Sequence, residues 1–458
     1  MQKNETVTLT IESLSSDGNG VGHTDGYAVF VPCSAVGDVA EVKLVKTQKT
    51  YAFGRIERIV TPSADRIAND CDSWPQCGGC AFRHIYYSAE LAAKRGFVCD
   101  ALTRIGHLYI EVAAVLVPPR CERYRNKVQF PVFEQTGGGL GIGFFASRSH
   151  RIVPADNCLL QDDVLNKIAH AVCELLSGTV PAYNEKTQKG MLRHIILRRS
   201  DLTKEIMLCL VINAKSMPNE EEFARMITRS FPEISTVVMN INRRNTNVIT
   251  GVECRTVFGS GYIEDMLCGV PVRLSPLSFF QINNSAAELL YAKIKELAEP
   301  SVGDTLLDIY CGAGTIGLSM AKNCRKIIGI EVVPEAVVDA KHNAAAMGIA
   351  NAEFIKGDAG SAAQTLLKRG ETVDIAVVDP PRKGCDSVTL ETLRALAPKK
   401  IVMVSCNPAT LARDLAWLQE AGYSAGTVYP VDMFPRTRHV EAVVLLENNM
   451  TKEDMTPI

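Results

Sequence analysis

The sequence IVMVSCNPATLARD, from Ile401 to Asp414, decides the fold because it joins a predicted strand to a predicted helix. The apolar run Ile401 to Val404 indicates a buried strand, and the residues after Pro408 have helical spacing. Pro408 lacks a backbone N–H, so it suits the first turn of a helix and makes Asn407 extended. Cys406 is therefore expected at the carboxyl end of a strand, directly before a helix.

This placement gives Cys406 a possible chemical role. The N-terminus of a helix lowers the pKa of a nearby thiol and favours the thiolate. Ligands also bind at the carboxyl ends of strands in open parallel sheets. The alternative is a buried structural cysteine, which is the commoner fate of this residue. The rest of the chain decides between the two interpretations.

Strand and helix patterns alternate regularly from Ser275 onward, which predicts an α/β, doubly wound, Rossmann-like domain. Strands are expected at Thr305 to Tyr310, Lys326 to Glu331, Ala352 to Lys356 and Ile375 to Val378. Helices are expected at Ser285 to Leu297 and Val332 to Met347.

A glycine-rich loop follows the first of these strands. Gly312 to Gly317 reads GAGTIG, a G-x-G-x-x-G pattern between a strand and a helix. Alone this pattern is weak, because dinucleotide-dependent dehydrogenases share it. Glu331, at the end of the second strand, can hold a ribose diol in either class of enzyme.

Two further acids favour S-adenosylmethionine over NAD. Asp358 follows the third strand, where it can meet an adenine ring. Asp379-Pro-Pro-Arg382 follows the fourth strand. The prolines could merely end that strand, but Asp-Pro-Pro at this place is typical of methyltransferases acting on nucleobases.

The first 61 residues alternate apolar and polar side chains between glycine turns, which predicts a small OB-like β-barrel. The formal net charge of the chain is -2, so an RNA-binding surface would have to be local. On the barrel such a surface would use the edge from Lys43 to Arg58, with Tyr51 and Phe53 stacking on bases.

Three closely spaced cysteines follow the barrel. Cys71, Cys77 and Cys80 form a Cx5CxxC pattern with two glycines before the last cysteine, and Cys158 is the best candidate for a fourth ligand. Zinc knuckles favour paired CxxC units, so the pattern fits a [4Fe–4S] cluster better. A zinc site and a loop without metal are the alternatives.

An α+β middle domain is expected around Cys158. Its predicted helices are Ser88 to Gly106, Gln161 to Leu176 and Glu220 to Ser230, and its strands are Arg193 to Arg199, Ile206 to Ile212 and Thr236 to Ile241. The first helix is expected to carry a basic face of Lys94, Arg95 and Arg104. A strand-like pattern begins at Val115. The stretch from Arg120 to Phe130 mixes cations with an aromatic residue, which is compatible with RNA contact and also with a solvated strand edge.

The chain has no apolar leader at its N-terminus and no apolar run near the ~18 residues of a membrane helix, so no membrane partner is expected. Its fifteen cysteines then indicate a reducing compartment, the cytoplasm, and cysteines used for catalysis or metal binding.

Five motifs resemble those of the S-adenosylmethionine-dependent RNA uracil-5-methyltransferases: FFQIN, DIYCGAGTIGL, DPPRKG, SCNPATLARDL and PRTRHVE. With a start like the TRAM domain and the cysteine quartet, the resemblance covers nearly the whole chain. It points to the bacterial 23S rRNA members, because bacterial tRNA members usually lack both barrel and cluster, although archaeal tRNA members can carry both. It implies a TRAM barrel at 1–61, a middle domain with the cluster and an RNA surface at 62–274, a methyltransferase domain at 275–448 and a disordered tail at 449–458.

The resemblance also implies roles for individual residues. The expected contacts with S-adenosylmethionine are Gln281, Tyr310, Thr315, Glu331, Asp358 and Asp379, and Phe279 is expected to lie against RNA. The cysteine quartet would hold the [4Fe–4S] cluster. Cys406 and Glu441 would be the catalytic pair.

The chemistry of uracil explains why such a pair is needed. Carbon 5 is a poor nucleophile, and addition of a thiolate to carbon 6 makes it reactive. A base must then remove the proton on carbon 5 so that the thiolate can leave. Two other interpretations are a non-catalytic RNA-binding or ribosome-assembly protein and a methyltransferase acting on protein. A monomer that binds RNA, 23S rRNA before tRNA, is the leading expectation.

Overall fold

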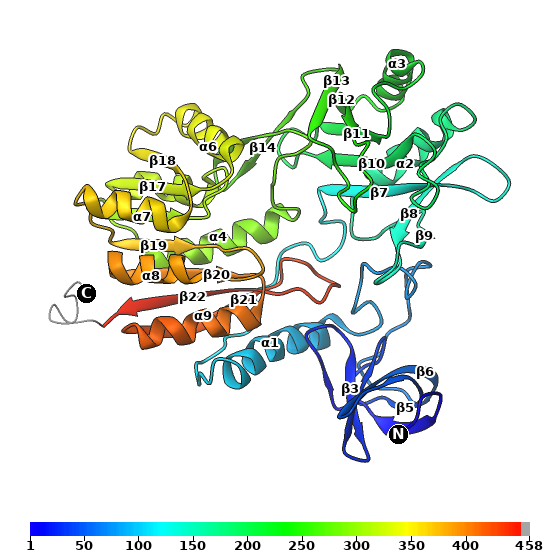
Figure 1. The fold of residues 1–458 in the computed structure, drawn as a ribbon, viewed down its shortest axis with the longest axis horizontal. Helices are drawn as coiled ribbons and strands as arrows, with labels where there is room; N and C mark the ends of the chain where they lie inside the picture. Colours follow the sequence, from blue (N-terminus) through cyan, green and yellow to red (C-terminus); the bar gives the residue numbers. More distant parts are fainter. Residues whose placement is uncertain (450–458) are drawn as a thin grey trace. The chain divides into compact units, whose positions relative to one another are not determined.

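The computed structural model describes residues 1–449 of the 458 residues (Figure 1), and it divides into two compact units. Unit 1 comprises Met1–Pro118, Pro380–Leu390 and Val402 onward, and unit 2 comprises Pro119–Asp379 and Glu391–Ile401. The tail predicted at 449–458 lies outside the described residues except for its first residue. Within residues 1–449, no helix has the length and apolarity that crossing a membrane requires.

Unit 1 begins with a six-stranded sheet in the order β1-β5-β6-β4-β3-β2. Its strands are β1 (Thr6–Thr10), β2 (Ser13–Leu14), β3 (Gly20–Thr24), β4 (Tyr27–Val31), β5 (Val39–Thr47) and β6 (Tyr51–Thr61). Alternate residues of β5 are buried, Ala40, Val42 and Leu44, because every second side chain of a strand faces the same side. The short alternating strands expected from the sequence are therefore present.

Helix α1 (Tyr87–Arg104) follows the barrel, and its predicted basic face is wrong for Lys94, whereas Arg95 and Arg104 are exposed. Lys94 is 0% exposed, and Arg95 donates to the backbone carbonyl of Val112 at 2.6 Å. The reason is that α1 packs against α9 (Pro408–Glu420) and β21 (Tyr423–Val431), which turns the Lys94 side of the helix inward. From sequence alone, a lysine or arginine on a helix is expected to be exposed, because the acidic partners that could bury it are not known.

The remaining strands of unit 1 carry the last motifs of the chain. Strand β21 pairs antiparallel with β22 (Glu441–Asn448), and Val431 lies opposite Glu441. Strand β20 (Lys400–Ser405) belongs to unit 1 from Val402 onward and leads through Cys406 into α9.

The middle part of unit 2 is a seven-stranded sheet in the order β13-β12-β11-β10-β7-β8-β9. Its strands are β7 (Lys127–Glu134), β8 (Leu140–Phe145), β9 (Ile152–Pro154), β10 (Leu192–Arg199), β11 (Ile206–Ile212), β12 (Ile234–Ile241) and β13 (Glu253–Phe258). Helices α2 (Asp163–Leu176) and α3 (Glu220–Ser230) pack their apolar sides on one apolar core with this sheet. The predicted strand from Val115 is wrong in its start, because the strand begins only at Lys127 and Arg123 has a left-handed backbone with φ 55°.

The last part of unit 2 alternates strands and helices as the sequence predicts. A hairpin of β14 (Ile263–Leu267) and β15 (Val270–Leu274) comes first. Then follow α4 (Asn284–Ala298), β16 (Thr305–Ile309), α5 (Thr315–Met320), a 3-10 turn (Ala321–Asn323), β17 (Lys326–Glu331), α6 (Pro334–Ala346), β18 (Ala352–Lys356), α7 (Ala359–Lys368) and β19 (Ile375–Val378). Helix α8 (Ser387–Leu396) belongs to unit 2 from Glu391 onward.

The parallel strands of this region lie in the order β18-β17-β16-β19. The chain moves from β16 outward to β18 and then returns to the other side of β16, so the strand order reverses between β16 and β19. In doubly wound sheets ligands bind beside such a reversal, at the carboxyl ends of the strands. The loops that start at Tyr310 and Asp379 therefore lie where a ligand is expected to bind.

Candidate active site

The loop after β16 turns sharply before α5. Tyr310 adopts a left-handed backbone with φ 66°, which a tyrosine rarely does, and Gly312 and Gly314 also have positive φ. A Cβ atom at Gly314 would lie 2.9 Å from the Phe354 ring, so this position admits only glycine without a shift. A Cβ atom at Gly312 would meet no atom within 4 Å, so its backbone faces open space where a ligand can approach.

Glu331 fixes this loop from the end of β17. Its Oε2 atom accepts a hydrogen bond from the Gly312 N–H at 3.0 Å, and its Oε1 atom accepts one from the Val333 N–H at 2.8 Å. The half-buried carboxylate thus joins the turns that follow two adjacent strands. This contact is one that the glycine pattern did not predict.

Two further acids lie on β16 and after β19. Asp308 is 1% exposed and accepts a hydrogen bond from the Gly317 N–H at 2.9 Å, while its Oδ1 atom has no hydrogen-bond partner among the described residues. Burial raises the pKa of Asp308 to about 7, opposed by the Gly317 bond and reinforced by the charges of Asp379 and Glu331. Burial also raises the pKa of Asp379 to about 6. With these pKa values Asp379 is mostly ionised at neutral pH and Asp308 only in part, and a cationic ligand beside them would favour their charged forms.

The other predicted cofactor residues have different surroundings. The hydroxyl groups of Thr315 and Tyr291 lie 3.0 Å apart. Asp358 is exposed and caps α7 by accepting from the Ser361 N–H at 3.0 Å, and this bond lowers its pKa. Gln281 is half-buried, and its backbone carbonyl accepts a hydrogen bond from the side-chain amide of Asn126 at 2.9 Å. Phe279, expected against RNA, is 83% exposed.

Cys406 lies where the sequence placed it, between the end of β20 and the start of α9. The thiol is half-buried. Asn407 is extended, with φ −138°, and its side chain caps α9 by accepting from the Ala409 N–H at 3.1 Å. Pro408 occupies the first turn, as expected from its missing N–H.

The loop from Pro380 to Asp386 is fastened to this helix start. The Asn407 side-chain amide donates to the Arg382 carbonyl at 3.0 Å, and the Cys385 N–H donates to Asp414 Oδ2 at 2.9 Å. Gly384 has φ 76°, and a Cβ atom there would lie 2.7 Å from Asp414 Oδ2. The helix that follows Cys406 therefore also holds the loop containing DPPRKG.

Arg382 reaches the third motif as well. Its Nη2 atom lies 3.5 Å from Nε2 of His439, two residues before Glu441. Glu441 is the first residue of β22 and is 9% exposed. SCNP, DPPR and HVE, which are far apart in the sequence, are thus linked within unit 1 through Arg382.

The three cysteines before α1 lie in a compact, half-buried loop. The Cys77 N–H donates to the Ser73 carbonyl at 2.8 Å, and the Gly79 N–H donates to the Cys77 sulfur at 3.4 Å. Within residues 1–449, no group of three or more His, Cys, Asp or Glu side chains is gathered in a position to hold a metal ion.

Cys158 lies in unit 2, and its carbonyl accepts a hydrogen bond from Arg123 Nη1 at 2.8 Å. The same guanidinium forms an ion pair with Asp163 at 2.7 Å. Arg123, for which the sequence left RNA contact and a solvated strand edge open, therefore stabilises the loop around Cys158.

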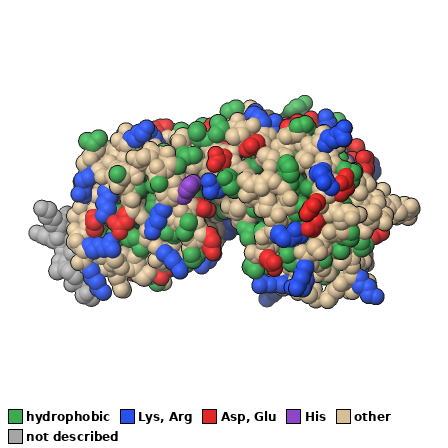
Figure 2. All heavy atoms as spheres, turned by 90° about the horizontal axis from the view of Figure 1, so that it is seen from above, with side chains coloured by type: hydrophobic (Ala, Val, Ile, Leu, Met, Phe, Trp, Pro, Cys, Tyr) green, Lys and Arg blue, Asp and Glu red, His purple; other side chains and the backbone are tan. Residues whose placement is uncertain are grey.

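The barrel presents the aromatic side chains predicted to stack on bases. Phe30, Tyr51 and Phe53 form a cluster with ring centroids 5.5 to 6.0 Å apart, and Tyr51 is 39% exposed. Arg55 and Arg58 on the same edge pair with glutamates. Figure 2 shows positive and negative side chains intermixed on the face it draws, consistent with the net charge of -2.

Two family models match the chain. The model described as tRNA (Uracil-5-)-methyltransferase matches residues 87–449, and the TRAM domain model matches residues 1–56. Among similar proteins, one from Halalkalibacterium halodurans is 41% identical over 98% of both chains, and one from Listeria monocytogenes is 42% identical over 98% of this chain and 99% of its own. Both are named uncharacterized RNA methyltransferases.

A solved structure is also similar over nearly the whole chain. It is the Pyrococcus abyssi tRNA (uracil-54, C5)-methyltransferase in complex with S-adenosyl-L-homocysteine. The TM-score is 0.75 at 27% identity, with 96% of this chain and 99% of that chain covered. The similarity confirms the expected fold, a Rossmann-like domain combined with an N-terminal barrel of strands.

Proposed function

The chain belongs to the tRNA (uracil-5-)-methyltransferase family of S-adenosylmethionine-dependent RNA methyltransferases, and we propose that it methylates carbon 5 of a uridine in 23S rRNA through a covalent adduct with Cys406. The observation that carries the proposal is the link through Arg382 between the loop around Asn407 and the segment that ends in Glu441. A binding protein would need neither a thiol at a helix start nor a buried acid at the end of the segment that Arg382 links to it.

In the proposed reaction the Cys406 thiolate adds to carbon 6 of uracil and makes carbon 5 nucleophilic. Glu441 then removes the proton from carbon 5 after methylation, and the carbon–sulfur bond breaks to restore the ring. The buried position of Glu441 suits a base that must act out of contact with bulk water. The target uridine must leave its stack to reach these groups, which favours loops in the RNA.

S-adenosylmethionine supplies the methyl group from a positively charged sulfur. The residues of unit 2 fit this molecule by their chemistry, since the open backbone at Gly312 and the acids Asp308 and Asp379 suit a cationic nucleoside ligand. We propose Gln281, Tyr310, Thr315, Glu331, Asp358 and Asp379 as the residues that bind it.

Separate observations support 23S rRNA and tRNA as the substrate RNA. The TRAM domain together with the cysteine quartet favours 23S rRNA, because the bacterial members that modify tRNA usually lack both. The similar Pyrococcus abyssi enzyme is named for tRNA, which makes tRNA the second candidate. Mass spectrometry of rRNA and tRNA from a deletion strain decides between them: 5-methyluridine missing from 23S rRNA supports the proposal, and its loss from tRNA alone overturns the choice of rRNA.

We also propose that Cys71, Cys77, Cys80 and Cys158 bind a [4Fe–4S] cluster. The support is the Cx5CxxC spacing and the Gly79 N–H that faces the Cys77 sulfur, a bond that stabilises a thiolate. Protein purified without air should contain about four iron and about four sulfide per chain. Stoichiometric zinc without visible absorption would overturn this assignment.

We propose a monomer that acts in the cytoplasm. Light scattering of the purified protein with and without RNA tests the first point, and a stable dimer would overturn it.

A further inference from the structure

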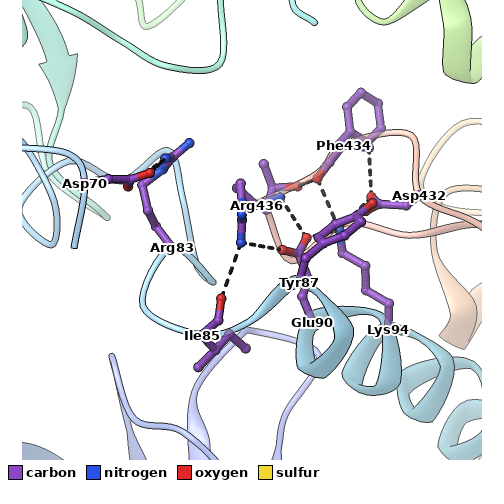
Figure 3. Close-up of polar contacts among 10 residues, drawn as sticks. Asp70, Arg83, Ile85, Tyr87, Glu90, Lys94, Asp432, Phe434 and Arg436 are labelled. Carbon is purple, nitrogen blue, oxygen red and sulfur yellow. Dashed lines mark hydrogen bonds and ion pairs between the residues drawn. The ribbon is translucent and has the colours of Figure 1, made fainter. Parts of the chain in front are cut away.

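The loop from Asp432 to Val440 joins β21 to β22 and ends directly at Glu441. Figure 3 shows that side chains of helix α1 converge on this loop, and that the backbone carbonyl of Ile85, just before the helix, meets Arg436. The two segments are far apart in sequence: Lys94 and Asp432 are separated by 338 residues. The contacts of the helix with this loop lie shortly before Glu441, the first residue of β22.

Asp432 is the first anchor. Its Oδ1 atom accepts from Lys94 Nζ at 2.7 Å, and its Oδ2 atom accepts from the Tyr87 hydroxyl at 2.7 Å. Lys94 Nζ also donates to the Phe434 carbonyl at 3.2 Å. One lysine and one tyrosine thus fix both the side chain and the backbone at the start of the loop.

Arg436 is the second anchor. Its backbone N–H donates to Glu90 Oε1 at 2.7 Å. Its backbone carbonyl accepts from the Ala81 N–H at 2.9 Å and from the Phe82 N–H at 3.2 Å. Its guanidinium lies 3.9 Å from the Glu90 carboxylate. The middle of the loop is therefore held through its backbone, which a substitution in the loop itself would not remove.

These contacts are in the interior. The side chains of Glu90, Lys94 and Asp432 are all 0% exposed. A buried ion pair is costly to assemble, and apolar residues of the same volume often stabilise a fold as well or better. A requirement for one defined geometry of the loop therefore explains these buried charges better than a contribution to stability does.

We propose that Tyr87, Glu90 and Lys94 are positioning residues that hold the Asp432–Val440 loop so that Glu441 stands where it can take the proton from carbon 5. The inference rests on the proposed function of Glu441. It assigns to α1, outside the motifs of the reaction, control of the last chemical step. It also gives a reason for the buried lysine that the sequence had presented as part of an exposed basic face.

The test measures formation and decay of the covalent protein–RNA adduct separately. Tyr87→Phe removes only the hydroxyl bonded to Asp432, and Asp432→Asn keeps the size of the acceptor without its charge. Both variants should form the methylated adduct within twofold of the parent rate and should lengthen its lifetime at least fivefold. Leu102→Ala is the matched control, because Leu102 is a buried residue of α1 that makes none of these bonds. It should lower the melting temperature and leave the lifetime unchanged.

A double-mutant cycle shows whether the effect passes through Glu441. In the Glu441→Gln background, Tyr87→Phe should add no further slowing, since the base is already absent. A parent-like adduct lifetime in both variants, or a longer lifetime in Leu102→Ala as well, overturns the positioning role while leaving the proposed function intact. Normal turnover by Glu441→Gln alone overturns the proposed role of Glu441, and the positioning role with it.

Discussion

The side-chain amide of Asn407 donates a 3.0 Å hydrogen bond to the backbone carbonyl of Arg382. The oxygen of the same side chain caps α9, so one residue fixes both the helix that follows Cys406 and the loop that carries DPPRKG. A side chain with two such tasks should be sensitive to truncation.

Asn407→Ala should slow adduct formation and also lower stability. Loss of an N-cap costs about 1 kcal/mol, which corresponds to a fall in melting temperature of about 2–4 °C for a domain of this size. The matched control is Asp162→Ala, which removes a cap of the same kind from α2 in unit 2. It should lower the melting temperature without slowing adduct formation. Equal rates in Asn407→Ala and the parent would show that the link to Arg382 has no part in catalysis.

Glu331→Ala should weaken binding of S-adenosylhomocysteine. The carboxylate is proposed to bind the ribose, and it also holds the Gly312 N–H at 3.0 Å. Loss of charge-assisted hydrogen bonds of this kind costs about 1.5–3 kcal/mol, or at least about tenfold in affinity. Isothermal calorimetry measures it. Glu335→Ala removes an exposed acid from the first turn of α6 and controls for net charge. The same affinity in Glu331→Ala and Glu335→Ala would contradict the assignment.

The affinity for S-adenosylmethionine should fall as the pH drops through about 6. Burial raises the pKa of Asp379 to about 6, and only its ionised form attracts the positive sulfur of the cofactor. S-adenosylhomocysteine has no such charge, so its affinity should depend less on pH. Asp379→Asn should lose the part of the dependence centred near this pKa. Parallel pH profiles for the two ligands would argue against a role of Asp379 beside the sulfur.

Glu90→Gln should become more stable relative to the parent as the pH rises. Burial raises the pKa of Glu90 to about 7, Lys94 and Arg436 lower it, and the Asp432 charge raises it further. The folded protein therefore keeps a proton on Glu90 that the unfolded chain has already released at lower pH. The free energy of unfolding of the parent thus falls as the pH rises from the ordinary carboxyl range to about 7, and glutamine removes this loss. Calorimetric melting temperatures between about pH 5 and about pH 8 measure the difference. A difference that stays constant or shrinks with pH would contradict the raised pKa.

The sequence predicted most of what depends on local pattern. The strands Lys326–Glu331, Ala352–Lys356 and Ile375–Val378 have the predicted bounds. The first and the last contain apolar runs, which mark a strand clearly in the sequence. Pro408 favours the start of α9 through its missing N–H, and this too was predicted, whereas the side-chain cap of Asn407 was not. The extended conformation that the proline requires is the one observed at Asn407.

The errors concern contacts between distant segments. Lys94 was assigned to a basic face because nothing near it in sequence shows that Asp432 will bury it. Arg123 was placed on a strand because neither its left-handed backbone nor its partner Asp163 can be inferred from composition. Asp308 stood inside a quoted motif but was overlooked. An acid near the carboxyl end of a buried apolar strand is the signal that could have identified it.

The central claim is that Cys406 forms the covalent bond and Glu441 releases it. The most direct measurement is a denaturing gel of protein mixed with labelled substrate RNA and S-adenosylmethionine. Glu441→Gln keeps the size and polarity of the side chain but cannot take the proton from carbon 5. It should give a slowly migrating protein–RNA band that contains the transferred methyl group, and Cys406→Ala and the double variant should give no such band. Methyl transfer by Cys406→Ala, or normal turnover by Glu441→Gln without the band, would contradict the account.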